Sequence, residues 1–368
     1  MTMPPAQPLW QQGELERGTG GSMDKNELQA AAEVLLSRLA QVKPGEVVVI
    51  TADMLVDPAL VEAISAAATK YEARRLTVWM DTPAGVGESA DADLPAEALK
   101  ALLRTADVWI ELNNHWLLYS GIYYDALKNN KKLRHIELTG SDCRTLVECV
   151  GKVDYEAMTA FTLLLRDKIR AAHEMWMTSL LGEDIRFCNQ TEQPVSAKLG
   201  IADKPGTHLF VGQIGWLPEP ESINGKIVFD VAIAPDIGIL NTPIEVMIEK
   251  GRITSICGGS EAAAFEAWLK GFDHPQMLGV AHTGIGFNPG AAVVGSILED
   301  QRVWGSTTWG FGSIGAGLLP PAGVKAPAHS DAVCLNTTLE VDGVLWMKDG
   351  QFVEPELAPL AAKLLASR

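Results

Sequence analysis

The chain lacks the features of a membrane protein, a disulfide-rich protein and a nucleic-acid-binding protein. No apolar stretch reaches the roughly 20 residues that a helix needs to span a bilayer. The five cysteines are odd in number and scattered, with no C-x-x-C pair, which excludes a dithiol or a cysteine-rich zinc site. A net charge of -16, without a basic patch, excludes nucleic acid and anionic membranes as partners. We expect a cytoplasmic protein with reduced thiols.

A dinucleotide-binding loop is missing as well. The turn after the first expected strand reads Thr-Ala-Asp-Met-Leu over residues 51–55. It has none of the glycines that let a backbone approach a pyrophosphate, so a Rossmann-type cofactor site is excluded. Residues 1–22 are rich in Pro, Gln and Gly, contain Glu14 and Glu16, and have no apolar core. We predict that they form a disordered extension rather than a signal peptide or a membrane anchor.

What is present suits two well-packed domains. The chain has 368 residues, of which 47% are hydrophobic and 21% are charged. That length is too great for one simple core. We predict an N-terminal, mainly parallel α/β domain over residues 23–180. It is followed by an α+β domain over residues 181–368 that carries the active site.

The first half alternates between helical and strand patterns, which favours a parallel sheet with helical crossovers. Asp57-Pro58 supplies a helix cap and a first-turn proline. Helices are predicted near residues 26–42, 57–71, 96–104 and 122–129, and strands near 45–50, 76–80, 106–112 and 133–138. The third strand leads directly into Asn113-Asn114-His115, and ligands bind at the carboxyl ends of parallel strands.

The second half begins after one long helix, which we predict over residues 154–181. The composition then changes to short β-rich segments with frequent Gly and Pro. Strands are predicted at 225–230, 244–249, 251–256, 333–339 and 343–346, and a helix at 261–271. Lys250-Gly251 forms the kind of hairpin turn that accepts positive φ.

The most informative motif is His329-Ser330-Asp331, at the start of an expected strand. Because strand side chains alternate, its imidazole and carboxylate face the same cavity. One further histidine would complete the two-His, one-carboxylate ligand set of non-haem iron(II) oxygenases. His282 is our candidate, and His208 and His274 are its rivals.

Several phrases of the second half resemble the aminopeptidase T/S-type metallopeptidase family, also called the thermophilic leucyl aminopeptidases. The phrases occur in order and begin at Gly212-Gln-Ile-Gly-Trp, Lys250-Gly-Arg-Ile, Gly284-Ile-Gly-Phe-Asn-Pro, Gly305-Ser-Thr-Thr-Trp-Gly and His329-Ser-Asp. They span roughly residues 205–350. The resemblance implies an α/β domain followed by a metal-binding domain of the same type.

Three positions depart from the pattern of the peptidases, which bind two metal ions with many carboxylates. Gln213 stands in place of a glutamate, His282 in place of another glutamate, and Thr308 in place of a histidine. His329 and Asp331 persist. This pattern resembles a divergent branch of the family, the 2,5-dihydroxypyridine 5,6-dioxygenases, which are mononuclear iron(II) enzymes.

That resemblance implies Fe(II) as the cofactor, held by His282, His329 and Asp331. It also implies a small heteroaromatic substrate and O2 as reactants, with ring opening of 2,5-dihydroxypyridine between C5 and C6 to N-formylmaleamate. A group that moves protons is needed nearby, and histidine is the natural choice. We predict this role for His115 and a contact of the Ser313 hydroxyl with the ring or O2. Glu183 and Glu192 are not assigned to the site.

Other interpretations remain open. The chain could be an aminopeptidase or amidase that uses Zn, Co or Mn, although Gln213 and Thr308 argue against it. A catalytically inactive scaffold is disfavoured by His329-Ser-Asp331. We expect a homo-oligomer, because the parent fold commonly self-associates. Trp216, Trp304 and Trp309 lie close to the site phrases, where they would form either an aromatic wall for a flat substrate or part of the core.

Overall fold

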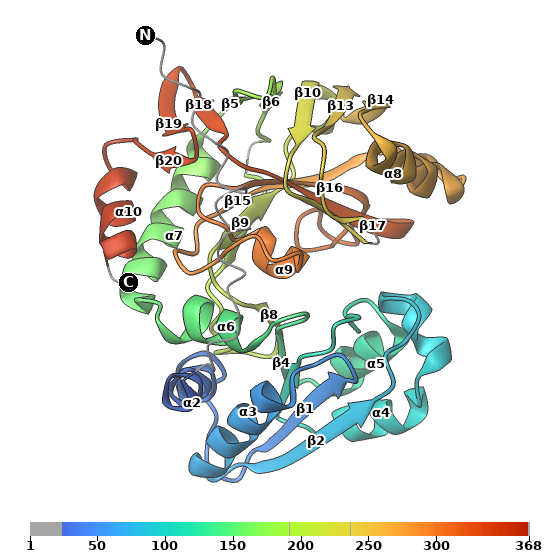
Figure 1. The fold of residues 1–368 in the computed structure, drawn as a ribbon, viewed down its shortest axis with the longest axis vertical. Coiled ribbons are helices and arrows are strands. Elements are labelled where there is room, and N and C mark those ends of the chain that lie inside the picture. The colour runs from blue at the N-terminus through green and yellow to red at the C-terminus, as the bar shows by residue number, and fades with distance from the viewer. Residues whose placement is uncertain (1–23, 191, 236, 367–368) are drawn as a thin grey trace.

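A five-stranded sheet, paired in parallel throughout, forms the lower layer of the molecule (Figure 1). The computed structural model describes residues 24–190, 192–235 and 237–366. The predicted extension, residues 1–22, lies outside them. The strands of this sheet, in spatial order, are β2 (Arg74–Met80), β1 (Val47–Asp53), β3 (Val108–Glu111), β4 (Arg134–Glu137) and β8 (Gly206–Leu209). The prediction of a mainly parallel sheet is therefore confirmed.

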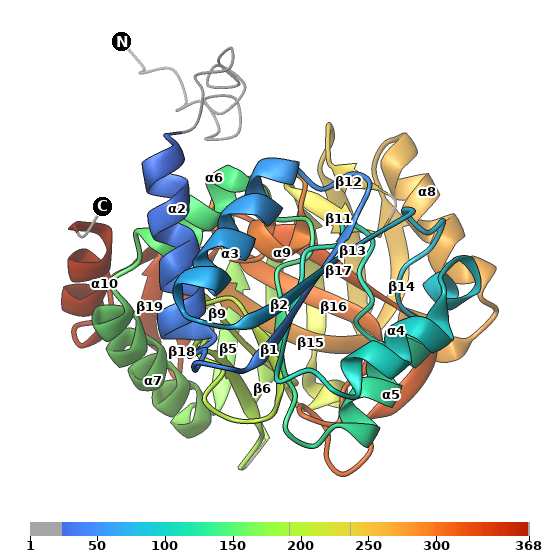
Figure 2. The same ribbon diagram turned by 90° about the horizontal axis from the view of Figure 1, so that it is seen from below.

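Helices cover both faces of this sheet because its central strands β1 and β3 are apolar and buried on both faces. Val48 and Ile50 share a core with α2 (Lys25–Val34) and α3 (Pro58–Lys70). Val49 and Trp109 share a second core with α4 (Ala96–Leu103) and α5 (Gly121–Asn129). Figure 2 shows the two helix pairs on opposite sides of β1 and β2. A π-helical turn (Leu35–Leu39) extends α2, and a 3-10 segment (Gly87–Asp93) precedes α4.

The local start signals act as expected, but one predicted helix ends early. The Asp57 side chain accepts the Ala59 N–H and caps α3, with Pro58 in its first turn. The helix predicted over 154–181 is α7 (Tyr155–Ala171), and the prediction was wrong beyond it. The remaining segment forms β5 (Glu174–Thr178), whose alternating burial is that of a strand with one covered face. Before α7 lie α6 (Cys143–Thr145) and a π-helical segment (Leu146–Gly151).

Two further sheets form the upper part of the molecule (Figure 1). We call the eight-stranded one sheet B and the seven-stranded one sheet C. Sheet B, in spatial order, contains β14 (Arg252–Cys257), β13 (Ile244–Glu249), β10 (Asn224–Phe229), β6 (Asp184–Cys188), β5, β18 (Thr338–Val341), β19 (Val344–Lys348) and β20 (Gln351–Phe352). Sheet C contains β12 (Gly238–Ile239), β11 (Ala232–Ala234), β17 (Val324–Cys334), β16 (Thr307–Ile314), β15 (Val280–Gly286), β9 (Gln213–Trp216) and β7 (Val195–Lys198).

Sheet C has two unlike faces, and this difference positions the site. Trp309 and Phe311 of β16 make aromatic contacts with Phe187 of β6 and Phe229 of β10, so one face packs on sheet B. Side chains alternate along each strand, so residues 308, 310 and 312 of β16 point to the other face. The smaller elements around these sheets are α8 (Ser260–Gly271), α9 (Ile297–Asp300), α10 (Leu357–Ala366) and the 3-10 turns Pro220–Ser222 and Pro275–Leu278.

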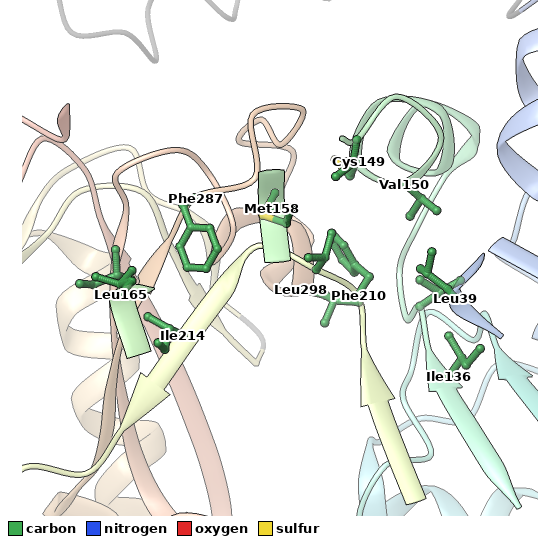
Figure 3. Packing of buried hydrophobic residues seen from close by; sticks show 14 of the residues in the cluster. Leu39, Ile136, Cys149, Val150, Met158, Leu165, Phe210, Ile214, Phe287 and Leu298 are labelled. Carbon is green, nitrogen blue, oxygen red and sulfur yellow. The ribbon is translucent and has the colours of Figure 1, made fainter. Parts of the chain in front are cut away.

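The chain crosses between the two halves more than once. Strand β8 follows the predicted boundary at residue 180, yet it pairs with β4 of the parallel sheet. Strand β5 precedes the boundary but belongs to sheet B. One apolar core continues across the crossing, from Ile136 of β4 through Phe210 and Leu298 to Ile214 of β9 (Figure 3). The division at residue 180 remains a prediction.

Apolar helices of membrane-spanning length are missing from the part of the chain that the structure describes.

Candidate metal centre

His329 and Asp331 lie on β17 and point to the face of sheet C that does not pack on sheet B. The pairing of β17 with β16 sets Gly312 opposite His329 and Gly310 opposite Asp331. His329 Nε2 lies 3.3 Å from Asp331 Oδ1. His329 Nδ1 lies 2.8 Å from the Ser313 carbonyl oxygen. A carbonyl only accepts, so Nδ1 carries the proton and the Nε2 lone pair faces the cavity.

His282 enters the same site from β15, opposite Gly310 in the register of β15 with β16. Its Nε2 lies 2.9 Å from Asp331 Oδ1 and 3.3 Å from His329 Nε2. The three residues are partly buried, and their ligand atoms form a group that could hold one metal ion. Two strands, β15 and β17, carry this cluster on either side of β16. We call it the triad: His282, His329 and Asp331.

The spacing of the triad fits a single ion. Metal–ligand bonds of about 2.1 Å at right angles put neighbouring ligand atoms about 3 Å apart. The three separations in the triad are 2.9, 3.3 and 3.3 Å. The repulsion between two facing nitrogen lone pairs is relieved by a metal cation or by a proton on one of the two rings. Two neutral nitrogens and one carboxylate, all on one side, match the facial ligand set of non-haem iron.

The electrostatics of the triad reflect its burial and its mixed charge. Burial disfavours the charged form of Asp331, but the neighbouring imidazoles, His329 first, hold the pKa of that carboxyl well below its usual range. Burial also opposes the charged form of His329, yet the Asp331 carboxylate raises the pKa of this imidazole overall. The site therefore keeps an anionic oxygen directed at the two rings, which favours a bound cation.

Two polar residues on the triad face are uncharged. Gln213 Nε2 donates to Gln301 Oε1 over 3.0 Å. Thr308 is fully buried, and its Oγ1 has no hydrogen-bond partner among the described residues. Neither side chain offers the anionic or imidazole ligand that a second adjacent dication would need. The local chemistry favours one metal ion.

His115 lies on the loop after β3, in the half of the molecule that does not carry the triad. Its Nδ1 is 2.6 Å from the Pro83 carbonyl oxygen, and its backbone N–H donates to Asp53 Oδ2 over 3.2 Å. The bond to Pro83 assigns the proton to Nδ1 and leaves Nε2 as the acceptor. No hydrogen bond joins His115 to the triad within the described ranges, so its role in proton transfer remains a prediction.

Ser313 contacts the triad through its backbone. Its carbonyl oxygen orients His329, as described above, whereas its hydroxyl donates to the Ala326 carbonyl over 2.9 Å and accepts the Ala326 N–H over 3.1 Å. These bonds close the irregular end of the β16–β17 pair. Sequence reasoning identified the residue but did not anticipate the carbonyl contact, because strand register decides it.

The rival histidines are held elsewhere. His208 Nε2 faces the Lys204 carbonyl at 2.8 Å, and His274 accepts the Gln276 N–H over 3.2 Å as the cap of a 3-10 turn. His135 is fully buried and pairs with Glu111 at 2.8 Å. A second group of potential ligands, His173, Glu174 and Cys188, lies on the surface.

The tryptophans near the site phrases belong to the core. Trp216 and Trp309 are fully buried, and both lie on strands where alternation directs them away from the triad face. Trp216 Nε1 donates to Asn189 Oδ1 over 3.0 Å. Trp304 is half-buried and packs against Phe161 and Phe352. None of these contacts provides the aromatic wall that the sequence suggested as one of two possibilities.

Comparisons with known proteins identify the family of the chain. Residues 28–354 match the model of the family described as 2,5-dihydroxypyridine 5,6-dioxygenase. A 2,5-dihydroxypyridine 5,6-dioxygenase from Pseudomonas putida is 28% identical over 201 residues, which are 51% of this chain and 56% of that protein. The sequence match thus spans little more than half the length of this relative.

Two solved structures share the fold. The structure of 2,5-dihydroxypyridine dioxygenase from Pseudomonas putida KT2440 has a TM-score of 0.74 at 23% identity, covering 92% of this chain and 100% of that one. AmpT from Thermus thermophilus has a TM-score of 0.68 at 13% identity, covering 90% of this chain and 100% of that one. The expected fold, in which a parallel sheet is combined with antiparallel sheets, is confirmed.

Proposed function

Because the chain belongs to the 2,5-dihydroxypyridine 5,6-dioxygenase family, we propose that it opens the ring of 2,5-dihydroxypyridine between C5 and C6. The C5–C6 bond breaks, and both atoms of O2 enter the product, N-formylmaleamate. One oxygen atom becomes part of a carboxylate on C5, and the other becomes the formyl oxygen on C6. The observation that carries this proposal is the three-member ligand cluster of the triad, whose ligand atoms lie close enough to hold one metal ion.

His282, His329 and Asp331 would hold Fe(II), each through one atom. The bound iron would supply neighbouring coordination positions for the substrate oxygen and for O2, which brings the two reactants together. The protein's own contribution is orientation. The Ser313 carbonyl fixes the tautomer and the ring plane of His329, and such outer contacts raise the basicity of a ligating imidazole.

The reaction also needs a group that accepts the proton of the ring hydroxyl and returns a proton later. We assign this task to Nε2 of His115, because its Nδ1 is protonated toward Pro83. The Ser313 hydroxyl is a further candidate for contact with the ring or O2. To make that contact it would have to give up its bonds to Ala326. Unchanged turnover in Ser313→Ala would remove the hydroxyl from the mechanism.

Self-association and a cytoplasmic location belong to the same proposal. Strand β2 is an edge of the parallel sheet. Its Leu76 and Trp79 have 48% and 41% of their surface exposed to solvent. Exposed apolar side chains on a sheet edge are a common basis for contact between copies of a chain.

All five cysteines are unpaired, as a reducing compartment requires. Light scattering on the purified protein and fractionation of the source cells would test the two statements.

Oxygen uptake tests the activity directly. The protein is loaded with Fe(II) under anaerobic conditions, and 2,5-dihydroxypyridine is then added in aerated buffer while O2 and the ultraviolet absorbance of the ring are followed. Consumption of O2 and substrate in a one-to-one ratio is the expected result. No uptake by protein that holds its iron would refute the proposal. Peptide and amide substrates with Zn, Co or Mn would then be tested.

A further inference from the structure

Lys198 lies on the same face of sheet C as the triad. Strand β15 pairs with β9, with Gly284 opposite Gly215, and β9 pairs with β7, with Gln213 opposite Lys198. Directly paired residues point to the same face, and every second residue along a strand shares it. Counting along these registers from His282 leads to Lys198 on one continuous face. Sequence patterns could not reveal this, since the two residues are 84 positions apart.

Glycines form the floor between the triad and Lys198. Gly284 and Gly215 are neighbours across β15 and β9 and carry no side chains, and the Gln213 amide borders them, 3.7 Å from where a Cβ of Gly284 would lie. A Cβ on Gly215 would meet only the Thr283 carbonyl oxygen, at 3.4 Å, and that atom belongs to the sheet itself. The space above Gly215 is therefore open. A flat strip of glycines, bordered by the Gln213 amide and beside a metal centre, suits a planar ring that lies on the sheet.

Two polar groups at the sides of this strip lack partners. Thr308 Oγ1, next to Gly284 in the β15–β16 register, is completely buried without a hydrogen bond among the described residues. Lys198 is half-buried, and no ion pair or hydrogen bond links its ammonium to any residue within the described ranges. A lysine is rarely withdrawn from water without an anionic partner, and buried polar atoms are usually satisfied. Both groups therefore lack a partner that a bound ligand would supply.

Three charged groups act on the ammonium of Lys198, and one of them, Asp331, belongs to the triad. Burial, and next the Arg302 guanidinium, lower the pKa of Lys198 to about 8, while Glu137 and then Asp331 act in the opposite direction. The ammonium is thus still mostly charged at neutral pH, but it is held less favourably than in water. An oxyanion placed beside it would restore that lost stabilisation.

We propose that Lys198 is a substrate-binding residue that determines specificity: the ring lies on the Gly284–Gly215 floor with one oxygen at the metal centre, and Lys198 binds the oxygen on the opposite side of the ring. This inference rests on the proposed function and adds the recognition of the 2-oxygen to it. The two oxygens of 2,5-dihydroxypyridine stand at opposite ring positions, so one substrate reaches both groups. A ring with only the metal-bound oxygen lacks the second contact.

Binding constants measured without O2 test this assignment. The Fe(II)-loaded wild type, Lys198→Met and Lys198→Gln are titrated under anaerobic conditions with 2,5-dihydroxypyridine and with 3-hydroxypyridine, which keeps the ring nitrogen and the 5-oxygen but lacks the 2-oxygen. We expect the Kd for 2,5-dihydroxypyridine to rise about 10- to 100-fold in both variants, as for loss of one hydrogen bond to a charged group. The Kd for 3-hydroxypyridine is expected to stay within about threefold.

Three readouts separate this role from a structural one. Lys348→Met, which changes an exposed lysine on β19, is the matched control and is expected to leave both constants unchanged. Iron content is expected to be unchanged in every variant. The melting temperature of the metal-free protein is expected to stay equal or to rise in Lys198→Met, because a half-buried unpaired ammonium costs stability. Lys198→Arg, which keeps the charge, is expected to restore part of the affinity.

The outcomes are distinct. A wild type that turns over 2,5-dihydroxypyridine, with both lysine variants binding it as tightly as the wild type does, would overturn the role of Lys198 and leave the proposed function intact. Equal weakening of both ligands, or loss of iron from the variants, would also overturn it, since the lysine would then support the site as a whole. A wild type that neither binds nor consumes 2,5-dihydroxypyridine would refute both proposals.

Discussion

Gly310 lies directly beneath the imidazole of His282: a Cβ at this position would be 2.3 Å from His282 Nε2. No real side chain tolerates that contact, so the ring of His282 occupies the volume that any other residue at position 310 would fill. The glycine thereby lets a histidine from β15 reach across β16 to Asp331 on β17. The geometry of the metal centre therefore depends on the missing side chain at position 310 as well as on the three ligands.

Gly310→Ala is expected to reduce iron affinity at least tenfold, because the new methyl group displaces His282 from the triad. Iron content after dialysis against a chelator is the measurement. Gly215→Ala is the matched control: its methyl group would meet only the Thr283 oxygen at 3.4 Å, so it is expected to keep iron and the melting temperature. Full iron content in Gly310→Ala would show that the position of His282 is not needed for metal binding.

Replacement of the ligands tests the triad itself. His329→Ala and Asp331→Ala are expected to abolish stoichiometric iron binding and O2 uptake, because each removes one ligand atom from a group that has three members among the described residues. His282→Ala is expected to have the same effect. His173→Ala, at an exposed histidine, serves as the control. A triad variant that keeps one equivalent of iron and full activity would disprove the assignment.

His115→Gln is expected to retain iron but to slow turnover by about 100-fold or more, the usual effect of removing a general base. Glutamine preserves a polar side chain near the Pro83 carbonyl, so the loop is expected to stay in place. The rate is measured at equal iron content in the wild type and the variant. Undiminished turnover would leave His115 as a residue that only anchors its loop.

Glu183 makes stability depend on pH. It is almost fully buried, and burial raises its pKa to about 8 although Thr337 Oγ1 donates to Oε2 over 3.1 Å. The folded state therefore binds this proton more tightly than the unfolded state, whose carboxyl titrates near 4.5. Stability is fully present below about pH 4.5 and is lost as the pH rises toward about 8, by an amount on the order of a few kcal/mol.

The corresponding variant is Glu183→Gln, which keeps the shape but cannot ionise. Its unfolding free energy, measured in urea, is expected to fall less than that of the wild type between pH 5 and about pH 8. Glu249→Gln, at an exposed position of β13, is expected to follow the wild type. A wild-type stability that is constant over this range would contradict the buried, protonated state of Glu183.

The sequence predicted those features of the fold and the site that depend only on residues adjacent in the chain. The cap at Asp57-Pro58 and the alternation of His329 and Asp331 are properties of adjacent residues, and the structure has both. The third histidine was different. Periodicity left His208, His274 and His282 as alternatives, and only the family resemblance favoured His282. The separations that bring it to Asp331 arise from strand pairing, which a single sequence does not encode visibly.

The register of strand pairing also explains why the sequence did not predict the glycine floor and Lys198. Gly215, Gly284 and Lys198 come from three strands, and their common face appears only when β7, β9 and β15 are aligned. The helix predicted to residue 181 failed for a related reason. Residues 174–178 have a sequence compatible with a helix, but pairing with β6 and β18 makes them a strand. Tertiary contacts overrode local propensity there.

The return of β8 to the parallel sheet has a mechanical consequence. The chain leaves this sheet after β4, visits both other sheets through β5, β6 and β7, comes back as β8, and leaves again for β9. Because β8 stays paired with β4, the connections on both sides of it, residues 199–205 and 210–212, would have to bend together in any rotation of one half against the other. The strand that follows β8 is β9, a direct neighbour of the triad strand β15, so the parallel sheet and the metal centre are linked by a connection of three residues.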